Sequence, residues 1–127
     1  MIEQLANYVN DNQGLVHRGR YVNFSFLLGI GDVDFIITIE HGRVAEVRPR
    51  RVKIDSGCFT IRASAEIWEE FWQPIPKRDH HDLFSMMAAG LAQIDGDLLP
   101  FFQNLLYIKE LVAAPRSLAS GFNHAEP

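Results

Sequence analysis

Residues 21–40 read YVNFSFLLGIGDVDFIITIE, and this stretch decides the fold. In both halves every second residue is apolar, and a glycine-rich segment from Gly29 to Asp32 separates the halves. Side chains of a strand alternate between its two faces, so each half predicts a strand with one apolar face. Two such runs joined by a short turn predict an antiparallel hairpin. The apolar faces consist of Val22, Phe24, Phe26 and Leu28 in the first strand and Val33, Phe35, Ile37 and Ile39 in the second.

Further strands and turns follow on the C-terminal side of this hairpin. The expected strands are 43–54 (one or two strands), 58–63 and a short final one at 91–95, and the expected turns are His41-Gly42 and Asp55-Ser56-Gly57. Short alternating runs bounded by such turns are typical of an antiparallel meander. We therefore expect an antiparallel sheet of about five strands.

Helical spacing of apolar residues replaces the alternation elsewhere in the chain. The expected helices span residues 1–12, the segment from Ser64 to Pro74, the segment from Asp79 to Gly90, and residues 98–113. The polar run from Asn10 to Gly14 should end the first helix. Ser64, Asp79 and Asp97 suit helix N-caps, because their side chains accept hydrogen bonds from free backbone N–H groups. Strands followed by helices predict an α+β fold, with the helices covering one face of the sheet.

Residues 98–113 carry the strongest helical pattern of the sequence. One stripe consists of Leu98, Phe101, Leu105, Ile108 and Val112, and Phe102, Leu106 and Leu111 widen it. From Pro115 onward the residues are small and polar, which is typical of loose chain ends. We therefore expect a single domain over residues 1–113 and a loose tail over 114–127.

The composition restricts the possible partners. The chain has 127 residues, of which 47% are apolar, and a net charge of -4, which suits one soluble domain and disfavours attraction to nucleic acid or anionic membranes. Cys58 is the only cysteine, so no intrachain disulfide forms and a reducing cytoplasm is expected. We expect no signal peptide and no membrane span, because no run reaches the roughly 20 apolar residues that a span needs.

The polar clusters do not form a catalytic signature. His80 and His81 are adjacent, and adjacent residues of a helix point about 100° apart, so the two do not converge on one metal. Glu69 and Glu70 fit the solvated face of a helix, because acid–base chemistry needs convergence in space rather than adjacency. We therefore expect no enzyme activity, no metal and no cofactor. A small enzyme that uses one of these histidines with one of these glutamates ranks last among the functional hypotheses.

Large apolar side chains are dense in the second half of the chain. They are Trp68, Phe71, Trp72, Phe84, Met86, Met87, Phe101 and Phe102. At helical spacing such residues usually indicate core packing. They also suit the wall of an apolar pocket, where methionine adapts to irregular neighbours. Composition leaves both interpretations open.

The segment from Gly90 to Asp97, GLAQIDGD, resembles a motif of the sterol carrier protein type 2 family. That family has a glycine, a short strand of alternating residues, and then Gly-Asp at the start of the last helix. The order of the upstream elements agrees, so the resemblance covers most of residues 15–113. The chain departs from the family pattern at Gln73-Pro-Ile-Pro76, at Met87 and at Leu91. These changes alter the expected pocket, and sterol specificity is not carried over.

The resemblance implies a sheet covered by helices around an apolar tunnel that holds a sterol, a fatty acid or an acyl derivative. The leading hypothesis is therefore non-enzymatic binding of such a lipid, with its transfer as a further step. The alternative is an accessory or dimerisation module, a homodimer or the partner of an enzyme, with no ligand of its own. The expected pocket residues are Phe71, Trp72, Phe84, Met87, Phe101, Leu105 and Ile108.

Overall fold

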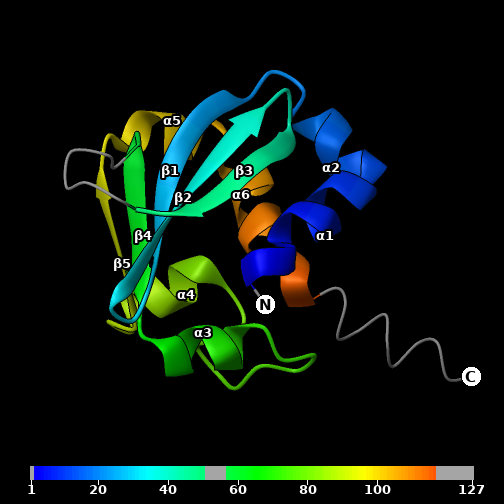
Figure 1. Cartoon of the computed structure of the whole chain (residues 1–127). Coiled ribbons are helices and arrows are strands. Elements are labelled where there is room, and N and C mark those ends of the chain that lie inside the picture. The colour runs from blue at the N-terminus through cyan, green and yellow to red at the C-terminus, as the bar shows by residue number, and fades with distance from the viewer. Residues whose placement is uncertain (1, 51–56, 117–127) are drawn as a thin grey trace, which may run out of the picture.

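The fold is a single sheet with its helices on one side (Figure 1). The structure is a computed structural model, and it describes residues 2–50 and 57–116. The strands are β1 (Asn23–Ile30), β2 (Val33–Glu40), β3 (Arg43–Pro49), β4 (Phe59–Ala63) and β5 (Ala92–Gly96). Their order in the sheet is β3-β2-β1-β4-β5. The predicted α+β class, strand number and one-sided helical layer are confirmed.

The sheet is mixed rather than fully antiparallel. The hairpin of β1 and β2 pairs Asn23 with Glu40 and Ile30 with Val33, as the alternation predicts. β4, however, does not continue the meander beside β3. It lies on the other side of β1 and pairs with it in parallel, with Leu28 opposite Ile61. The sequence predicts this strand but not its neighbour, because alternation determines which side chains share a face and not which strands pair.

Part of the predicted third strand and third turn lies outside the described residues. The prediction of strand structure over 43–54 is met by β3 as far as Pro49. Residues 51–54 of that prediction, and Asp55 and Ser56 of the turn, fall in the part that the structure does not describe.

The N-terminal helical region continues beyond the expected stop. Its elements are η1 (Ile2–Gln4), α1 (Leu5–Asp11) and α2 (Gln13–Arg18). The polar run ends α1 as predicted, but the side chain of Asn12 accepts a hydrogen bond from the backbone N–H of Leu15 and caps a second helix. The same residue types that stop one helix can therefore begin the next.

The middle helices are shorter than predicted. They are α3 (Ala65–Phe71) and α4 (Leu83–Ala88). Ser64 caps α3 as predicted, because its Oγ accepts the N–H of Ile67 at 3.2 Å. Asp79 does not cap α4. Asp82 has that role and accepts the N–H groups of Phe84 and Ser85. Both aspartates precede an apolar run, so the local sequence does not decide which of them caps α4. That depends on the tertiary contacts of Asp82.

The last predicted helix is divided into α5 (Leu98–Gln103) and α6 (Leu105–Val112). Asp97 caps α5 as predicted and accepts the N–H of Leu99 at 3.2 Å. The division falls at Asn104, whose side-chain Nδ2 donates to the carbonyl of Pro100 at 3.0 Å. Asparagine competes with backbone groups for such carbonyls, which explains the interruption. Phe102 and Leu106, which are predicted to widen the apolar stripe, are exposed instead, so the buried face is narrower than expected.

One cluster of apolar side chains joins the sheet to all the helices. It includes Leu5, Phe26, Ile61, Trp68 and Ile108, each fully buried. Within residues 2–50 and 57–116, no polar or charged residue is fully buried. The described start of the predicted tail packs against the domain, because Ala114 is buried and Arg116 donates to the carbonyl of Phe71. The division of the chain into a domain and a loose tail stays a prediction.

Candidate functional site

Four of the seven predicted pocket residues are buried in the core. Phe71, Trp72, Phe101 and Ile108 are 2%, 6%, 1% and 0% exposed. The other three, Phe84, Met87 and Leu105, are half-buried and pack against the same core. The seven residues therefore meet one apolar cluster, but they do so as packed side chains.

Phe101 of α5 lies at the centre of an aromatic group. Its ring is 5.4 Å from that of Phe59 on β4 and 6.2 Å from that of Phe84 on α4, both measured between centroids. The edge of one ring meets the face of the other in both pairs, which is a favourable arrangement. Phe84 also stacks on the exposed ring of Phe102 at 6.4 Å. Phe84 therefore connects the interior of the protein to its surface.

Phe71 and Trp72 belong to a second aromatic group at the end of α3. Both rings lie 5.4 Å from that of Trp68, measured between centroids. The indole N–H of Trp72 donates to the carbonyl of Val112 at 2.8 Å, and that of Trp68 donates to the carbonyl of Gly29 at 2.8 Å. Buried indoles usually find such partners. These bonds fix α3 against α6 and β1, so this group is less free to rearrange than the group around Phe101.

A charged pair stands beside Phe84. The Nζ of Lys109 is 2.7 Å from Oδ1 of Asp82 and 5.3 Å from the centroid of the Phe84 ring. Burial raises the pKa of Asp82, but the hydrogen bond and charge of Lys109 and the backbone N–H groups outweigh burial and leave that pKa below its usual value. The pair holds the start of α4 against α6.

A third charged residue of this region, Arg116, contacts Phe71. Its Nε and Nη2 donate to the carbonyl of Phe71 at 2.8 and 2.6 Å, and its guanidinium lies 4.5 Å from the centroid of the Phe71 ring. Burial lowers the pKa of Arg116. A surface pocket of about 230 Å³ lies between Arg116, Lys109 and Leu106. Apolar and charged side chains both line it, and its two cations, Lys109 and Arg116, are engaged by protein groups.

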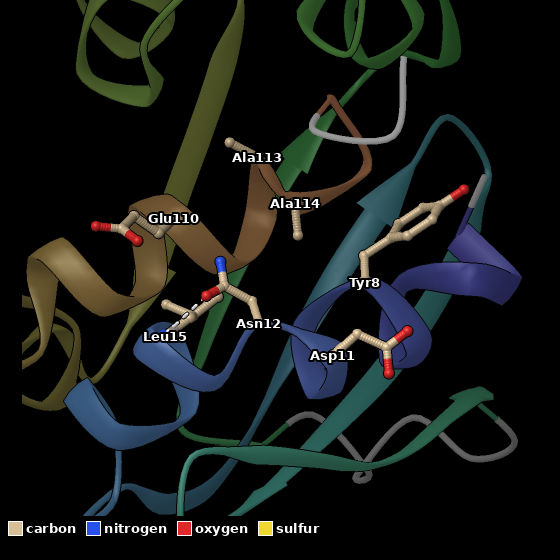
Figure 2. Close-up of a pocket in the computed structure, with 7 residues that line it drawn as sticks. All are labelled: Tyr8, Asp11, Asn12, Leu15, Glu110, Ala113 and Ala114. Carbon is tan, nitrogen blue, oxygen red and sulfur yellow. Dashed lines mark hydrogen bonds between the residues drawn. The ribbon is translucent and has the colours of Figure 1, made fainter. Parts of the chain in front are cut away.

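A larger surface pocket, of about 360 Å³, lies between α1, α2 and α6. Figure 2 shows the residues that line it. Asn12 lies at its centre and is occupied with the cap of α2, drawn as a dashed line to Leu15. Glu110 at its edge pairs with Arg18. The carboxylates of Glu110 and Asp11 point away from each other, so the pocket offers no convergent polar set for a substrate. It shares no residue with the predicted apolar site.

The residues of the enzyme hypothesis do not converge in the structure. A ring nitrogen of His80 is 2.9 Å from the carbonyl of Arg78, and Oε2 of Glu70 accepts the backbone N–H of Lys77. His81 and Glu69 are exposed. Within the described residues, no group of three or more His, Cys, Asp or Glu side chains could hold a metal ion. No described helix is long and apolar enough to cross a bilayer.

Sequence reasoning missed an ion cluster on the sheet face opposite the helices. Asp34 of β2 accepts hydrogen bonds from Arg62 of β4 at 2.6 and 3.3 Å and from Arg50 at 3.2 Å. The Arg62 side chain crosses Gly29, where a Cβ would come within 2.8 Å of its guanidinium nitrogen. The missing signal is the position of β4 beside β1, which brings Arg62 near Asp34. The cluster therefore lies away from the apolar site.

No family model matches the sequence, and no curated protein matches it. Solved structures match its fold. A crystal structure of sterol carrier protein 2 superposes with a TM-score of 0.71 at 16% identity, over 91% of this chain and 92% of that chain. A conserved hypothetical protein from Thermus thermophilus matches with a TM-score of 0.65 at 17% identity, over 94% of this chain and 86% of that one. A UbiJ-SCP2 ubiquinone synthesis protein matches with a TM-score of 0.59 at 15% identity, over 91% and 87%.

These matches establish that the chain has the sterol carrier protein 2 fold over nearly its whole length. The resemblance seen in the segment from Gly90 to Asp97 is thereby confirmed at the level of fold. In this chain the segment forms β5 and the cap of α5, and it brings α5 over the sheet beside Phe59.

Proposed function

We propose that this protein binds an apolar ligand between the sheet and helices α4, α5 and α6 without catalysing a reaction. The ligand classes are a fatty acid, an acyl derivative or a sterol-like lipid. The observation that carries the proposal is the apolar path at Phe84, whose ring contacts both the buried Phe101 and the exposed Phe102. The fold supports it, because the matched structures include sterol carrier proteins.

A ligand has to displace protein side chains, because the region is occupied by the aromatic group around Phe101. Phe84, Met87 and Leu105 are the side chains that turn outward at the lowest cost, since they are already half in solvent and lose fewer contacts. The interior then offers apolar surface with no fully buried polar residue among those described, so a hydrocarbon chain meets no unpaired group. In this proposal the site opens only as the ligand enters it.

The test is a titration of delipidated protein with a fluorescent fatty acid. We expect saturable binding by the wild type. Leu105→Trp places an indole in the volume that the ligand needs, and its affinity should fall about tenfold, while its stability falls by at most about 1–3 kcal/mol from overpacking. Phe84→Ala removes the ring that blocks the path, so this variant should melt earlier but bind at least as tightly as the wild type.

Ile75→Trp is the matched control, because Ile75 is 89% exposed in the segment between α3 and α4. It adds the same side chain away from the site and should change neither the melting temperature nor the titration. Absence of saturable binding in the wild type, together with no lipid in solvent extracts of freshly purified protein, would contradict the proposal.

The second candidate is an accessory module with no ligand of its own. The filled interior favours it, because four of the seven predicted pocket residues are at most 6% exposed. One matched structure is a ubiquinone synthesis protein, which suits a module that serves an enzymatic pathway. Native mass spectrometry separates the candidates. A lipid adduct supports the carrier, and a ligand-free chain bound to a protein partner or to a second copy supports the module.

A further inference from the structure

Three of the large exposed apolar side chains lie together on α5 and α6. Leu99, Phe102 and Leu106 are 63%, 53% and 68% exposed. Leu99 and Phe102 are three residues apart on α5, as on one helical face, and Leu106 follows at the start of α6; we call the three the exposed stripe. Among residues 2–50 and 57–116, the other large exposed apolar residues are dispersed on separate segments, namely Tyr21, Val33 and Ile75. Single exposed apolar residues are ordinary, whereas a contiguous group marks an interaction surface.

The exposed stripe is joined to the proposed binding site. The ring of Phe102 stacks on that of Phe84, with centroids 6.4 Å apart and ring planes 18° apart, and it also meets the buried Phe101 at 5.3 Å. Leu105, next to Leu106 in the sequence, is half-buried against the core. An apolar molecule that reaches the stripe is therefore in contact with the side chains that would move to admit it.

The charges around the stripe indicate an uncharged partner. Lys109 is paired with Asp82, and Arg18 with Glu110. Arg116 donates to backbone carbonyls. These nearby cations are therefore engaged by protein groups, and the chain has a net charge of -4. A strongly anionic surface would be repelled, whereas a zwitterionic one would not.

The size of the stripe argues against a stable dimer. A standard protein–protein interface takes roughly 20–30 residues from each side and buries about 800 Å² on each partner. The exposed stripe has three side chains, far fewer than such an interface uses. They suffice for shallow insertion into the boundary between lipid headgroups and acyl chains, where binding strength follows the apolar area buried. An association of that kind is weak and reversible.

We propose that the exposed stripe is a docking surface for a zwitterionic lipid bilayer. Leu99, Phe102 and Leu106 insert into the interface, which places Phe84 at the membrane surface, where an apolar ligand can leave the bilayer for the protein interior. The route of the ligand rests on the proposed function, but docking itself does not. Because the contact is apolar and small, the protein detaches readily, as a carrier must.

The test is flotation of the full chain with phosphatidylcholine vesicles. We expect the wild type to float with them, to an extent that hardly changes between about 50 and 500 mM salt, because no charge pairing is involved. The combined variant Leu99→Ser, Phe102→Ser, Leu106→Ser should lose binding about tenfold, since its apolar contact is removed. The combined variant Tyr21→Ser, Ile75→Ser is the matched control and should float like the wild type.

Three outcomes would overturn docking. The wild type could fail to float, the stripe variant could float as well as the wild type, or the wild type could form a dimer that the stripe variant dissolves. All five substituted side chains are exposed, and unchanged circular dichroism verifies the folds. The double variant Leu99→Ser, Leu106→Ser leaves the contact of Phe102 with Phe84 intact, so it distinguishes the two proposals in a fatty-acid titration without vesicles. Retained ligand binding with lost vesicle binding separates docking from ligand binding. Vesicle docking without any ligand binding would contradict the proposed function alone.

Discussion

Asp34 accepts hydrogen bonds from two arginines on the sheet face opposite the helices. The hydrogen bond from Arg62 holds the pKa of Asp34 below its usual value; burial opposes this, and the charges of Arg62 and Arg50 reinforce it. The Asp34 side chain is 19% exposed and that of Arg62 is 39% exposed, so solvent screens part of the attraction. The carboxylate nevertheless connects β2 and β4 across β1.

We predict that Asp34→Asn makes the protein less sensitive to acid. A carboxylate with a lowered folded-state pKa stabilises the fold at any pH above its unfolded value of about 3.9, and loses that contribution as the pH falls through the folded value. The wild type should therefore exceed the variant in stability by about 1 kcal/mol at pH 7 and by progressively less below about pH 4. Urea unfolding as a function of pH measures this. A difference that is constant with pH would exclude the ionised carboxylate as its cause.

The helix caps show what the sequence can predict for single residues. Ser64 and Asp97 cap the helices they were expected to cap, because capping depends on neighbours two or three residues away. The sequence analysis assigned the cap of α4 to Asp79 instead of Asp82. Asp82 also pairs with Lys109, a residue 27 positions further along the chain, and the local sequence does not reveal that contact. Partners at such distances are set by the tertiary fold and leave no local signal.

α6 is held at both ends by side chains from distant elements. The hydroxyl of Tyr107 donates to the carbonyl of Gly42 in the turn between β2 and β3, at 2.6 Å, and its ring lies where a Cβ on Gly19 would be, 2.2 Å from the nearest ring atom. The carbonyl of Val112 accepts the indole N–H of Trp72. Burial raises the pKa of Tyr107, so its hydroxyl stays a donor.

We predict that Tyr107→Phe destabilises the protein by about 1–3 kcal/mol, because the buried carbonyl of Gly42 loses its donor while the packing of the ring is kept. Tyr8→Phe is the matched control, since the hydroxyl of Tyr8 bonds to Gln4 in an exposed position. That variant should stay within about 0.5 kcal/mol of the wild type. Equal losses in the two variants, measured by urea unfolding, would mean that the bond to Gly42 is unimportant.

Among the elements, regular patterns were predictable and their interruptions were not. β1 and β2 follow from alternation alone, and the residues of their hairpin pair as that pattern requires. The parallel pairing of β4 with β1 and the division at Asn104 were not foreseen. The first depends on how the chain crosses the sheet, and the second on one side chain that competes for the carbonyl of Pro100.

In the whole molecule, the seven expected pocket residues belong to one apolar cluster, and their role as a pocket stays a prediction. All seven expected pocket residues meet the core, yet four are fully buried and three are half-buried. Which side chains face a ligand depends on how far each helix lies from the sheet. The spacing of apolar residues in the sequence does not reveal that distance. The exposure of Phe102 and Leu106 is likewise a property of the packed molecule that periodicity did not predict.

We predict that a bound lipid raises the melting temperature of the delipidated protein. A ligand at about 100 times its dissociation constant stabilises the folded state by about 2.7 kcal/mol, which in a domain of this size is a shift on the order of 10 °C. Leu105→Trp should show a much smaller shift at the same ligand concentration. Scanning calorimetry with a fatty acid, an acyl derivative and a sterol compares the three classes. No shift with any of them would favour the accessory module.

The two tryptophans of the chain give the protein a built-in optical signal. Trp68 and Trp72 are the only ones in the sequence, both are buried, and their rings stack with an angle of 22° between planes. An indole in apolar surroundings emits at shorter wavelength than one in water, so the folded chain has a blue-shifted emission from a single locus. The indole N–H groups of these two tryptophans make the hydrogen bonds that join α3 to β1 and α6. The wavelength of the tryptophan emission therefore reports whether these three elements stay together, without any attached dye.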